Sequence, residues 1–172
     1  MINRMSATGL MVDLSHFAKM EKILTADMDR ITEEVFTMTG HYVNIDSGDQ
    51  VSDLLFKKLK LKQIRPKLTK SGDRESVDDE VLTAIQHEHP VVSLLLEYKE
   101  YSKLRGTYVV PMPKLARRVA QGEWRMFPNF GCTRIPSGRL NCKDPNLLAM
   151  PNRTDRGREV CEGFITKPGW VY

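Results

Sequence analysis

Residues 130–154 read Phe130-Gly131-Cys132-Thr133-Arg134-Ile135-Pro136-Ser137-Gly138-Arg139-Leu140-Asn141-Cys142-Lys143-Asp144-Pro145-Asn146-Leu147-Leu148-Ala149-Met150-Pro151-Asn152-Arg153-Thr154. This segment is dense in turn-forming residues, because Gly can take positive φ, Pro fixes φ, and Asp and Asn side chains bond their own backbone. The expected turns lie at residues 137–138 and 143–146. Four basic side chains lie between and around these turns: Arg134, Arg139, Lys143 and Arg153.

These basic side chains allow two interpretations. A rigid backbone that presents guanidinium groups suits contacts to phosphates or base edges, since a planar fork binds such acceptors bidentately and loses little entropy on binding. Alternatively, the segment is a solvated loop whose arginines pair with carboxylates elsewhere in the chain. Composition alone leaves both interpretations open.

The order of residues resembles the first palm motif of family A DNA polymerases, the bacterial DNA polymerase I type, written T-x-T-G-R-L-S-S-x-x-P-N-L-Q-N-I-P-x-R. Three parts of that motif keep their spacing here, at residues 138–140, 144–147 and 151–153. Leu148 and Ala149 depart from the family's Gln-Asn, whose amides would add polar contacts to DNA. Ser137 replaces Thr, and Asn141-Cys142 replaces Ser-Ser.

The composition sets outer limits on the chain. With 172 residues and 41% hydrophobic content, the sequence can build the core of one domain or of two small ones. No apolar run approaches the ~20 residues of a membrane span, and the first residues lack the apolar region of a signal peptide. We therefore expect a cytoplasmic protein.

Neither the cysteines nor the histidines indicate a metal site. Cys132, Cys142 and Cys161 form no C-x-x-C pair, which favours reduced structural thiols over a disulfide framework or a zinc knuckle. His87-Glu88-His89 lies directly before Pro90, where a junction between two helices is expected.

Positive charge is unevenly distributed. From Lys103 to the end there are 13 Lys/Arg against 5 Asp/Glu, whereas residues 1–102 hold 13 against 17. Residues 57–70 carry seven positive charges and no negative one. Two basic zones separated by acidic helices offer two places to grip a polyanion.

The first hundred residues predict a long antiparallel helix pair. Residues 9–13 indicate a turn, a short strand and an Asp13 N-cap, followed by a helix to about Thr39 that Gly40 stops. The partner runs from Pro90 to about Leu104. Apolar residues at a three-four spacing predict the seam: Leu14, Phe17, Leu24, Met28, Ile31, Val35 and Met38 on the first helix, and Val91, Leu94, Leu95, Tyr98 and Leu104 on the second.

Two shorter helices are expected between the long ones. Residues 47–50 have the spacing of a capping box that starts at Ser47, and Ser76 is expected to cap the second helix. Their inward positions are Val51, Leu54, Leu55 and Leu59, and Val77, Val81, Leu82 and Ile85. Both helices lead to the loop at residues 62–74, so the basic run is placed to clamp a sugar-phosphate backbone without reading sequence. A solvated charged face is the alternative.

This helical part also resembles the family. The start of the family A thumb is echoed by residues 5–13, and its later segments by residues 44–56, 71–82 and 103–108. The resemblance implies an α+β fold. A thumb-like helical subdomain with a long antiparallel helix pair spans residues 1–108, and an incomplete, N-terminal part of an antiparallel β palm spans residues 109–172.

After Tyr108 the pattern becomes extended. Residues 124–130 and 161–165 have strand-like content, and residues 167–169 form a turn into Trp170-Val171-Tyr172. That last segment is expected to be an apolar edge that needs a partner.

The resemblance also implies roles for individual residues. Arg139 matches the family arginine that reaches the minor groove at the primer terminus, where every correct pair offers an acceptor. Asn146 and Arg153 match duplex-contacting positions nearby, and Lys103 and Arg105 lie where thumb meets palm. The full predicted DNA-binding set is Arg139, Asn146, Arg153, Lys103, Arg105, Lys57, Lys58, Lys60, Lys62, Arg65, Lys67, Lys70, Arg134 and Lys143.

Catalysis is not expected from this chain alone. The family's D-Y-S-Q-I-E-L-R motif, whose aspartate helps to hold the catalytic Mg²⁺ ions, is absent from the sequence, as are the fingers helix, the second palm aspartate and the 3′–5′ exonuclease domain. Two-metal phosphoryl transfer needs paired carboxylates. Mg²⁺ is therefore expected only in a complementary palm, and this chain is expected to need no cofactor of its own.

Two functional hypotheses remain. In the first, the chain is the primer-template-binding portion of a split or truncated polymerase that acts in replication or repair, and a second polypeptide supplies the metal site and fingers. In the second, it is a non-catalytic double-stranded DNA-binding module or a polymerase remnant. The chain can also be an incomplete gene product or a fragment.

Overall fold

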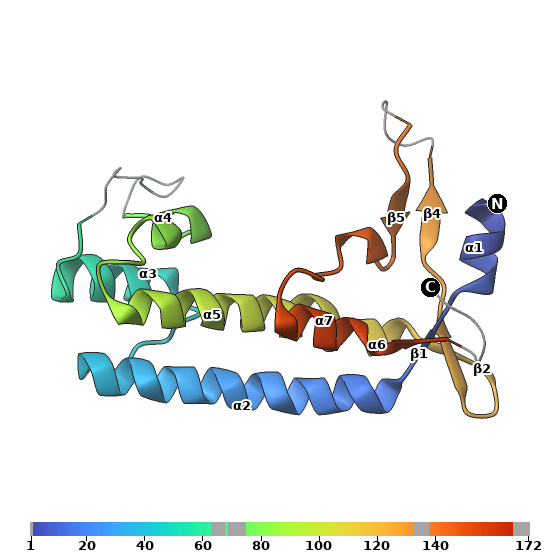
Figure 1. The fold of residues 1–172 in the computed structure, drawn as a ribbon, viewed down its shortest axis with the longest axis horizontal. Coiled ribbons are helices and arrows are strands. Elements are labelled where there is room, and N and C mark those ends of the chain that lie inside the picture. The colour runs from blue at the N-terminus through green and yellow to red at the C-terminus, as the bar shows by residue number, and fades with distance from the viewer. Residues whose placement is uncertain (1, 63–67, 69–74, 133–137, 167–172) are drawn as a thin grey trace. The chain divides into compact units, whose positions relative to one another are not determined.

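The computed structural model describes residues 2–62, 68, 75–132 and 138–166 (Figure 1). The chain forms two compact units. The strand unit comprises Met1–Leu24 and Lys103–Tyr172, and the helical unit comprises Thr25–Ser102. As predicted, the fold is α+β: long helices pack together, and small antiparallel sheets accompany them.

The helical unit is built on the later part of α2 (Leu14–Thr39) and most of α5 (Pro90–Leu104), which run antiparallel (Figure 1). Three short helices complete the unit: α3 (Gly48–Ser52), the π-helical turn η1 (Asp53–Lys58) and α4 (Asp79–Ala84). One apolar cluster joins all five elements, and its least exposed members are Ile31, Val35, Leu54, Leu55, Leu82, Ile85, Val91, Val92 and Leu95. Burial of this surface is the main stabilising term of the unit.

Helix ends in this unit match the sequence expectations in part. Gly40 follows α2 with φ +68°, the left-handed conformation that favours glycine at a helix end. Met38, predicted to lie in the seam, is instead 50% exposed. It lies in the last turn before Gly40, beyond Val35, the last fully buried position of α2.

Ser47 occupies the N-cap position of α3 as predicted, but the capping box and the Ser76 cap were wrong. The Ser47 side chain makes no capping bond, and the Gln50 side chain that would complete the box accepts from the Asn44 backbone N–H instead. At the second helix the cap is Asp78, whose carboxylate accepts from the Val81 N–H at 3.0 Å. Ser76 bonds the N–H of Asp78 rather than a helical one, so it belongs to the turn before the helix.

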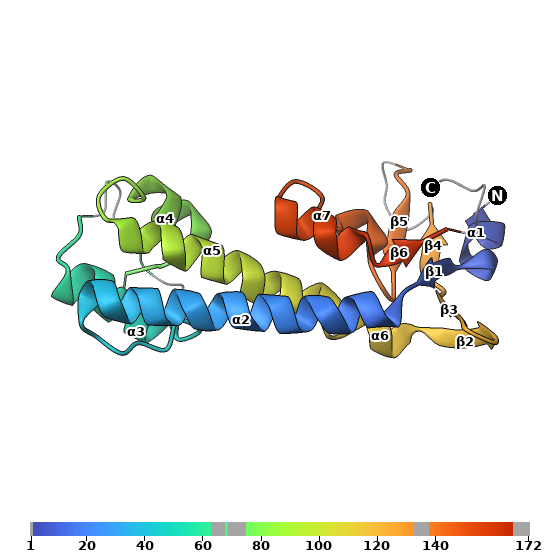
Figure 2. The same ribbon diagram turned by 60° about the horizontal axis from the view of Figure 1, so that its bottom comes forward.

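The strand unit contains a four-stranded antiparallel sheet in the order β2-β3-β1-β6 (Figure 2). Its strands are β1 (Leu10–Val12), β2 (Arg117–Ala120), β3 (Glu123–Met126) and β6 (Phe164–Ile165). A separate hairpin pairs β4 (Asn129–Gly131) with β5 (Asn141–Lys143). The remaining elements are α1 (Ile2–Thr8), the π-helical turn η2 (Arg105–Val109), α6 (Met112–Leu115), the 3₁₀ turn η3 (Leu147–Ala149) and α7 (Asp155–Cys161).

The entry into α2 follows the prediction. Gly9 takes φ +64° before β1, and an added Cβ there would lie 2.5 Å from the Met126 carbonyl oxygen. Asp13 then caps α2: one carboxylate oxygen accepts from the backbone N–H of Ser15 at 2.8 Å and of His16 at 3.2 Å.

Two extended predictions need correction. Residues 124–130 are not one strand, because Phe127 and Pro128 separate β3 from β4, and a proline offers no N–H to a ladder. Residues 161–165 are extended only at β6, since Cys161 is the last residue of α7. Thr154 starts that helix by accepting from the Gly157 N–H at 3.2 Å, a signal that the strand interpretation overlooked.

No helix in the described ranges combines the length and the apolar composition that a membrane crossing requires.

Candidate nucleic-acid interface

The β4–β5 hairpin presents Arg139 to solvent. Phe130 pairs with Cys142, and Gly131 pairs with Asn141. A Cβ added at Gly131 would lie only 3.0 Å from the side-chain oxygen of Asn141. Gly138 takes φ +68° just before Arg139, and the Arg139 side chain is exposed. Arg139 thus lies two residues before the start of β5.

The next two predicted contacts lie at the last residue of β5 and just beyond it. Lys143 ends that strand, and Asn146 precedes η3; both side chains are exposed. Asp144 has φ +54°, a left-handed conformation that Asp tolerates better than most residues. This bend lies between Lys143 and Asn146.

A buried tyrosine ties η3 to η2. The hydroxyl of Tyr108 donates to the Ala149 carbonyl at 2.6 Å, and Tyr108 is only 7% exposed. Lys103, at the end of α5, is exposed, whereas Arg105 in η2 donates to Glu21 at 3.3 Å. Of the two residues predicted at this place, Lys103 therefore has the more accessible charge.

Arg153 is set by the start of α7. Gly157 packs so closely on the Pro151 carbonyl that no Cβ fits between them. Arg158, one turn along α7, pairs with Asp155 and donates to the Arg153 carbonyl at 3.3 Å. The backbone of Arg153 is thus held from both sides while its side chain stays exposed.

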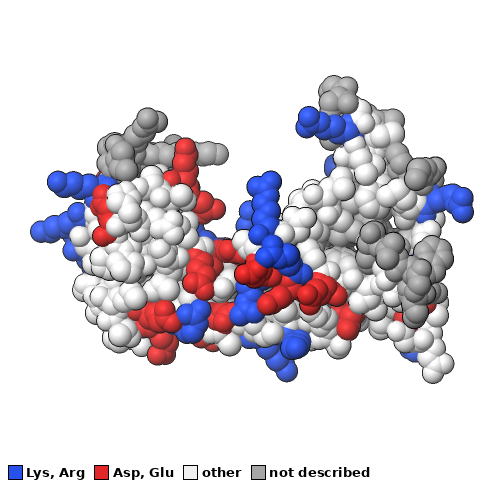
Figure 3. Space-filling model, in the orientation of Figure 1, with Lys and Arg blue, Asp and Glu red and all other residues white. Residues whose placement is uncertain are grey.

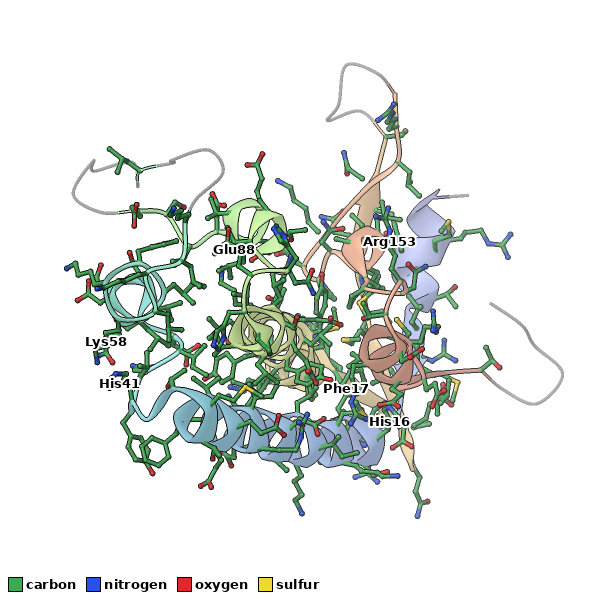
Figure 4. The ribbon with its side chains drawn as sticks, turned by 60° about the vertical axis from the view of Figure 1, so that its left-hand side comes forward. His16, Phe17, His41, Lys58, Glu88 and Arg153 are labelled. Carbon is green, nitrogen blue, oxygen red and sulfur yellow. The ribbon has the colours of Figure 1, made fainter. Side chains whose placement is uncertain are left out.

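Contacts from α2 anchor α7 in the strand unit (Figure 4). His16 Nε2 donates to the Glu159 carbonyl at 2.7 Å, and the Phe17 ring meets that of Phe164 edge to face at 5.8 Å. Gly163 leaves room for Phe17, because an added Cβ would lie 2.6 Å from its ring. The segment that carries Arg153, residues 151–157, is therefore held in place by an aromatic contact between Phe17 and Phe164.

The second basic group lies in the helical unit. Lys57 is paired one helical turn away with Asp53 at 2.7 Å, and that hydrogen bond raises the pKa of the Lys57 ammonium. Lys58 and Lys60 are exposed, with Lys60 in a left-handed conformation at φ +54°. The backbone N–H of Lys62 donates to Glu88 at 3.1 Å. Figure 3 shows Lys and Arg side chains projecting at the η1 end of this unit.

These contacts bear on the alternative that the arginines pair with carboxylates. Within the described part of the chain, Arg139, Lys143 and Arg153 have no carboxylate at ion-pair distance. Arg105 and Lys57 do pair. The predicted residues Arg65, Lys67, Lys70 and Arg134 lie outside the described residues, as does the predicted edge at 170–172.

Sequence reasoning missed several accessible cations of the strand unit. Arg117 and Arg118 are exposed on β2, next to Trp124 on the paired strand, and Arg158 adjoins Arg153. The β2 arginines belong to a strand that was not predicted. The position of Arg158 on a helix could have been predicted, because Thr154 and Asp155 are typical residues of a helix start.

The described residues hold no group of three or more His, Cys, Asp or Glu side chains suited to a metal ion. His89 accepts from the Val91 N–H at 3.1 Å, as expected at the junction between α4 and α5. All three cysteines are free thiols, and burial raises the pKa of Cys161.

Comparison with known proteins finds relatives that match almost the entire chain. The family model of DNA polymerase family A matches residues 14–172. The chain is 37% identical over 168 residues to the thermostable DNA polymerase I of Thermus thermophilus, covering 98% of this chain and 20% of that protein. It is 31% identical to DNA polymerase I of Deinococcus radiodurans, covering 99% and 17%.

A solved structure shares the fold. It is the polymerase domain of Pol1 from M. smegmatis in complex with DNA primer-template and dNTP, with a TM-score of 0.76 and 25% identity. The likeness covers 95% of this chain and 28% of that one. The chain thus spans about a fifth of the full-length relatives that it matches. With 159 of its 172 residues matched by the family model (172 − 13), the chain belongs to DNA polymerase family A.

Proposed function

We propose that this chain is the primer-template-binding portion of a family A DNA-directed DNA polymerase, acting in the cytoplasm in replication or repair. Residues 1–108 act as the thumb and residues 109–172 as the first strands of the palm. The observation that supports this best is the run of exposed donors Arg139, Lys143, Asn146 and Arg153 on a braced turn-rich backbone. The M. smegmatis relative, which shares the fold, is a complex with primer-template.

The two basic groups divide the work of binding. Arg139 donates to the purine N3 or pyrimidine O2 acceptor that every correct pair presents in the minor groove, so it tests pair geometry without reading sequence. Lys58, Lys60 and the lysines beyond them bind phosphates of the duplex. Asn146 and Arg153 contact the duplex beside the primer terminus.

Phosphoryl transfer requires groups that this sequence does not supply. Paired carboxylates that hold two Mg²⁺ ions stabilise the attacking and leaving oxygens, and they come from a complementary palm, carried by a second polypeptide or by further sequence of the same one. The same complement brings the fingers that bind the nucleotide. This chain's part is to hold the duplex so that the primer terminus reaches that centre.

The proposal is tested by binding and by complementation. The full chain is titrated with a labelled primer-template, a blunt duplex and a single strand of equal length at several salt concentrations. We expect preference for the recessed 3′ end and salt-dependent binding to both duplexes. Primer extension with Mg²⁺ should then appear only when a polypeptide with the rest of a family A palm and fingers is added.

Three results would decide against parts of this proposal. Equal affinity for all three nucleic acids would remove the primer-terminus role. Duplex binding without extension on mixing would favour a non-catalytic DNA-binding module. No binding to any duplex at low salt would overturn the proposal as a whole.

A further inference from the structure

We propose that the outer edge of β2 binds an acidic, extended segment of another protein, which adds to the sheet as a further strand. β2 is the first strand in the order β2-β3-β1-β6, and β3 is the only strand paired with it among the described residues (Figure 2). An edge strand turns the N–H and C=O groups of alternate residues away from the sheet, where another strand can pair with them. The inference does not depend on DNA binding.

The edge is open to solvent. All four residues of β2 are exposed, and Val119 is 46% exposed. Within the described ranges, no backbone hydrogen bond outside the helices and strands involves residues 117–120. The outward N–H and C=O groups of β2 are thus accessible. A peptide that adds as a strand would satisfy them with main-chain hydrogen bonds, the usual source of affinity in this mode of recognition.

Positive charge selects the strand that can bind. Arg117 and Arg118 lie on β2, and Lys114 precedes them in α6; all three side chains are exposed. In the part of the chain that the structure describes, none of the three has a carboxylate at ion-pair distance. The acid of the β2–β3 hairpin, Glu123, pairs with Arg125 at 2.6 Å.

The rest of the strand unit adds no acid to this surface. Its residues outside the described ranges are Met1, 133–137 and 167–172, and their sequence contains no Asp or Glu. Asp73, the only acid of the chain outside those ranges, belongs to the helical unit. The edge of the strand unit is therefore positively charged and attracts a strand that carries carboxylates.

The register of β2 gives each face of an added strand its own arginine. Arg118 lies opposite Trp124 on the paired strand, and Arg117 lies opposite Arg125. Since successive residues of a strand point to opposite faces, the two arginines of β2 lie on different faces of the sheet. Two neighbouring carboxylates of an added strand can therefore pair with one arginine each, and opposite charges across a strand pair are stabilising.

Other occupants satisfy this edge less well. A second copy that pairs through its own β2 would bring arginines close to arginines, and like charges opposite each other destabilise a strand pair. The shift in pairing register between Arg118 and Ala120 also shortens the regular edge, a common protection against self-association. Phosphates of a nucleic acid or a lipid surface would accept from the arginines but have no N–H groups for the outward carbonyls of β2. An acidic strand supplies both.

The test uses blocked peptides that differ in charge or in backbone donors. The full chain is titrated with T-V-E-E-V-T and, separately, with T-V-K-K-V-T, and the backbone amide NMR signals of residues 117–120 are followed. We expect saturable shifts with the acidic peptide alone. Two forms of the acidic peptide, each N-methylated at one set of alternate residues, test the backbone pairing. One form should bind and the other should not, because the N–H groups of a strand alternate between its two edges.

Two double variants locate the charge. Arg117→Ala combined with Arg118→Ala should weaken binding of the acidic peptide by about 2- to 30-fold, the range for two opposite-charge pairs across strands. Lys19→Ala combined with Lys22→Ala removes the same charge from two exposed lysines of α2 and should leave peptide binding unchanged.

Several results would overturn the proposal. With the peptides, these are no saturable shift with the acidic one, equal shifts with the acidic and lysine forms, binding of both N-methylated forms, and equal weakening by the two double variants. The same shifts of residues 117–120 with oligo-dT or with phosphatidylserine vesicles would assign the edge to phosphates, and dimerisation that broadens these signals without peptide would assign it to a second copy. Each result would leave the DNA-binding proposal unaffected, because that proposal rests on other residues.

Discussion

The Tyr108 hydroxyl donates a 2.6 Å hydrogen bond to the backbone carbonyl of Ala149, 41 residues further along the chain. Ala149 is one of the positions at which the segment departs from the family motif, yet the bond uses its backbone and does not depend on its side chain. This contact fixes the turn after β5 to the end of the long helical stretch. The backbone beside the exposed donors is therefore held in position by the hydrogen bond of a buried tyrosine.

We expect Tyr108→Phe to lower the free energy of unfolding by about 0.5 to 1.5 kcal/mol, the usual net contribution of one hydrogen bond. Urea unfolding followed by circular dichroism measures the change. Tyr42→Phe is the matched control, because Tyr42 is 77% exposed and its ring stacks on Phe36 rather than filling a core. Equal losses in the two variants would show that the Ala149 contact is not the stabilising one.

Arg139→Ala tests the minor-groove role. It should weaken binding to a primer-template by about 1 to 3 kcal/mol, the scale of a good bidentate base contact, and should leave binding to a blunt random duplex nearly unchanged. Fluorescence anisotropy on both substrates measures the difference. Arg118→Ala, which removes another exposed arginine of the strand unit, is the control. Equal losses on both substrates would count against the assigned contact.

The basic group of the helical unit should act through phosphates. Reversing the charge at Lys57, Lys58 and Lys60 together should lower affinity for every duplex and flatten the dependence of binding on salt. Single changes refine this: Lys58→Ala and Lys60→Asn should each reduce the salt slope by about 1, and Asn suits the left-handed backbone at position 60.

The control for these changes is Lys22→Ala, an exposed lysine of α2 outside the predicted set. Binding isotherms at four or more salt concentrations give the slopes. A slope change for Lys22→Ala as large as that for Lys58→Ala would mean that net charge, rather than this surface, governs binding.

Asp13 should make stability depend on pH. The Ser15 hydroxyl, followed by the backbone N–H groups of His16 and Ser15, holds the pKa of Asp13 below its usual value of 3.8. Because the folded-state pKa is the lower one, the stabilisation is present above the unfolded value and is lost as pH falls through the folded value. Wild type should therefore lose this contribution on acidification below pH 3.8, the usual pKa of the group.

Asp13→Asn keeps a capping oxygen but does not titrate, so it should lose less stability than wild type over the same acid range. Thermal unfolding of both proteins at neutral and acid pH measures the difference. Identical pH dependence in the two proteins would show that Asp13 is not a significant titrating group in folding.

Gly157→Ala should destabilise the segment that carries Arg153, residues 151–157. The added Cβ meets the Pro151 carbonyl, and neither backbone segment can move freely, so a cost of about 1 to 3 kcal/mol is expected. Gly106→Ala is the control: nothing lies within 4 Å of its Cβ, and it should be neutral or slightly stabilising. Unfolding curves compare the two, and a neutral Gly157→Ala would contradict the close packing.

The sequence predicted the long helices well because their signals are strong and local. A capping Asp13, a stop at Gly40 and regularly spaced apolar residues define α2, and Pro90 marks the start of α5. The short elements were harder, since their caps compete with nearby turns. Gln50 accepts from the Asn44 N–H in the preceding loop, and Asp78 rather than Ser76 accepts from an N–H of α4.

The sequence predicted which basic residues belong to the candidate interface. It predicted only in part how these residues are arranged and which of them pair with carboxylates. The sequence shows that Arg105 and Lys57 are basic, but not that Glu21 and Asp53 pair with them, because one pairing spans 84 positions and the other depends on the pitch of a short helix. The brace from Tyr108 to Ala149 has no sequence signal either. It arises from folding of distant segments onto one another.

The two π-helical turns have a further consequence for how this chain accepts insertions and deletions. In η1 the Leu59 N–H bonds the Leu54 carbonyl, and in η2 the Val110 N–H bonds the Arg105 carbonyl, five residues back in each case. A π-helical turn holds one residue more than the α-helical turn it replaces, and each residue advances a helix by about 100°. Loss of one residue from η2 would thus restore a regular helix and rotate Tyr108 away from its partner, whereas loss of one from η1 would turn Lys58 to another side. The number of residues in η1 and in η2 therefore helps to determine the directions in which Lys58 and Tyr108 point.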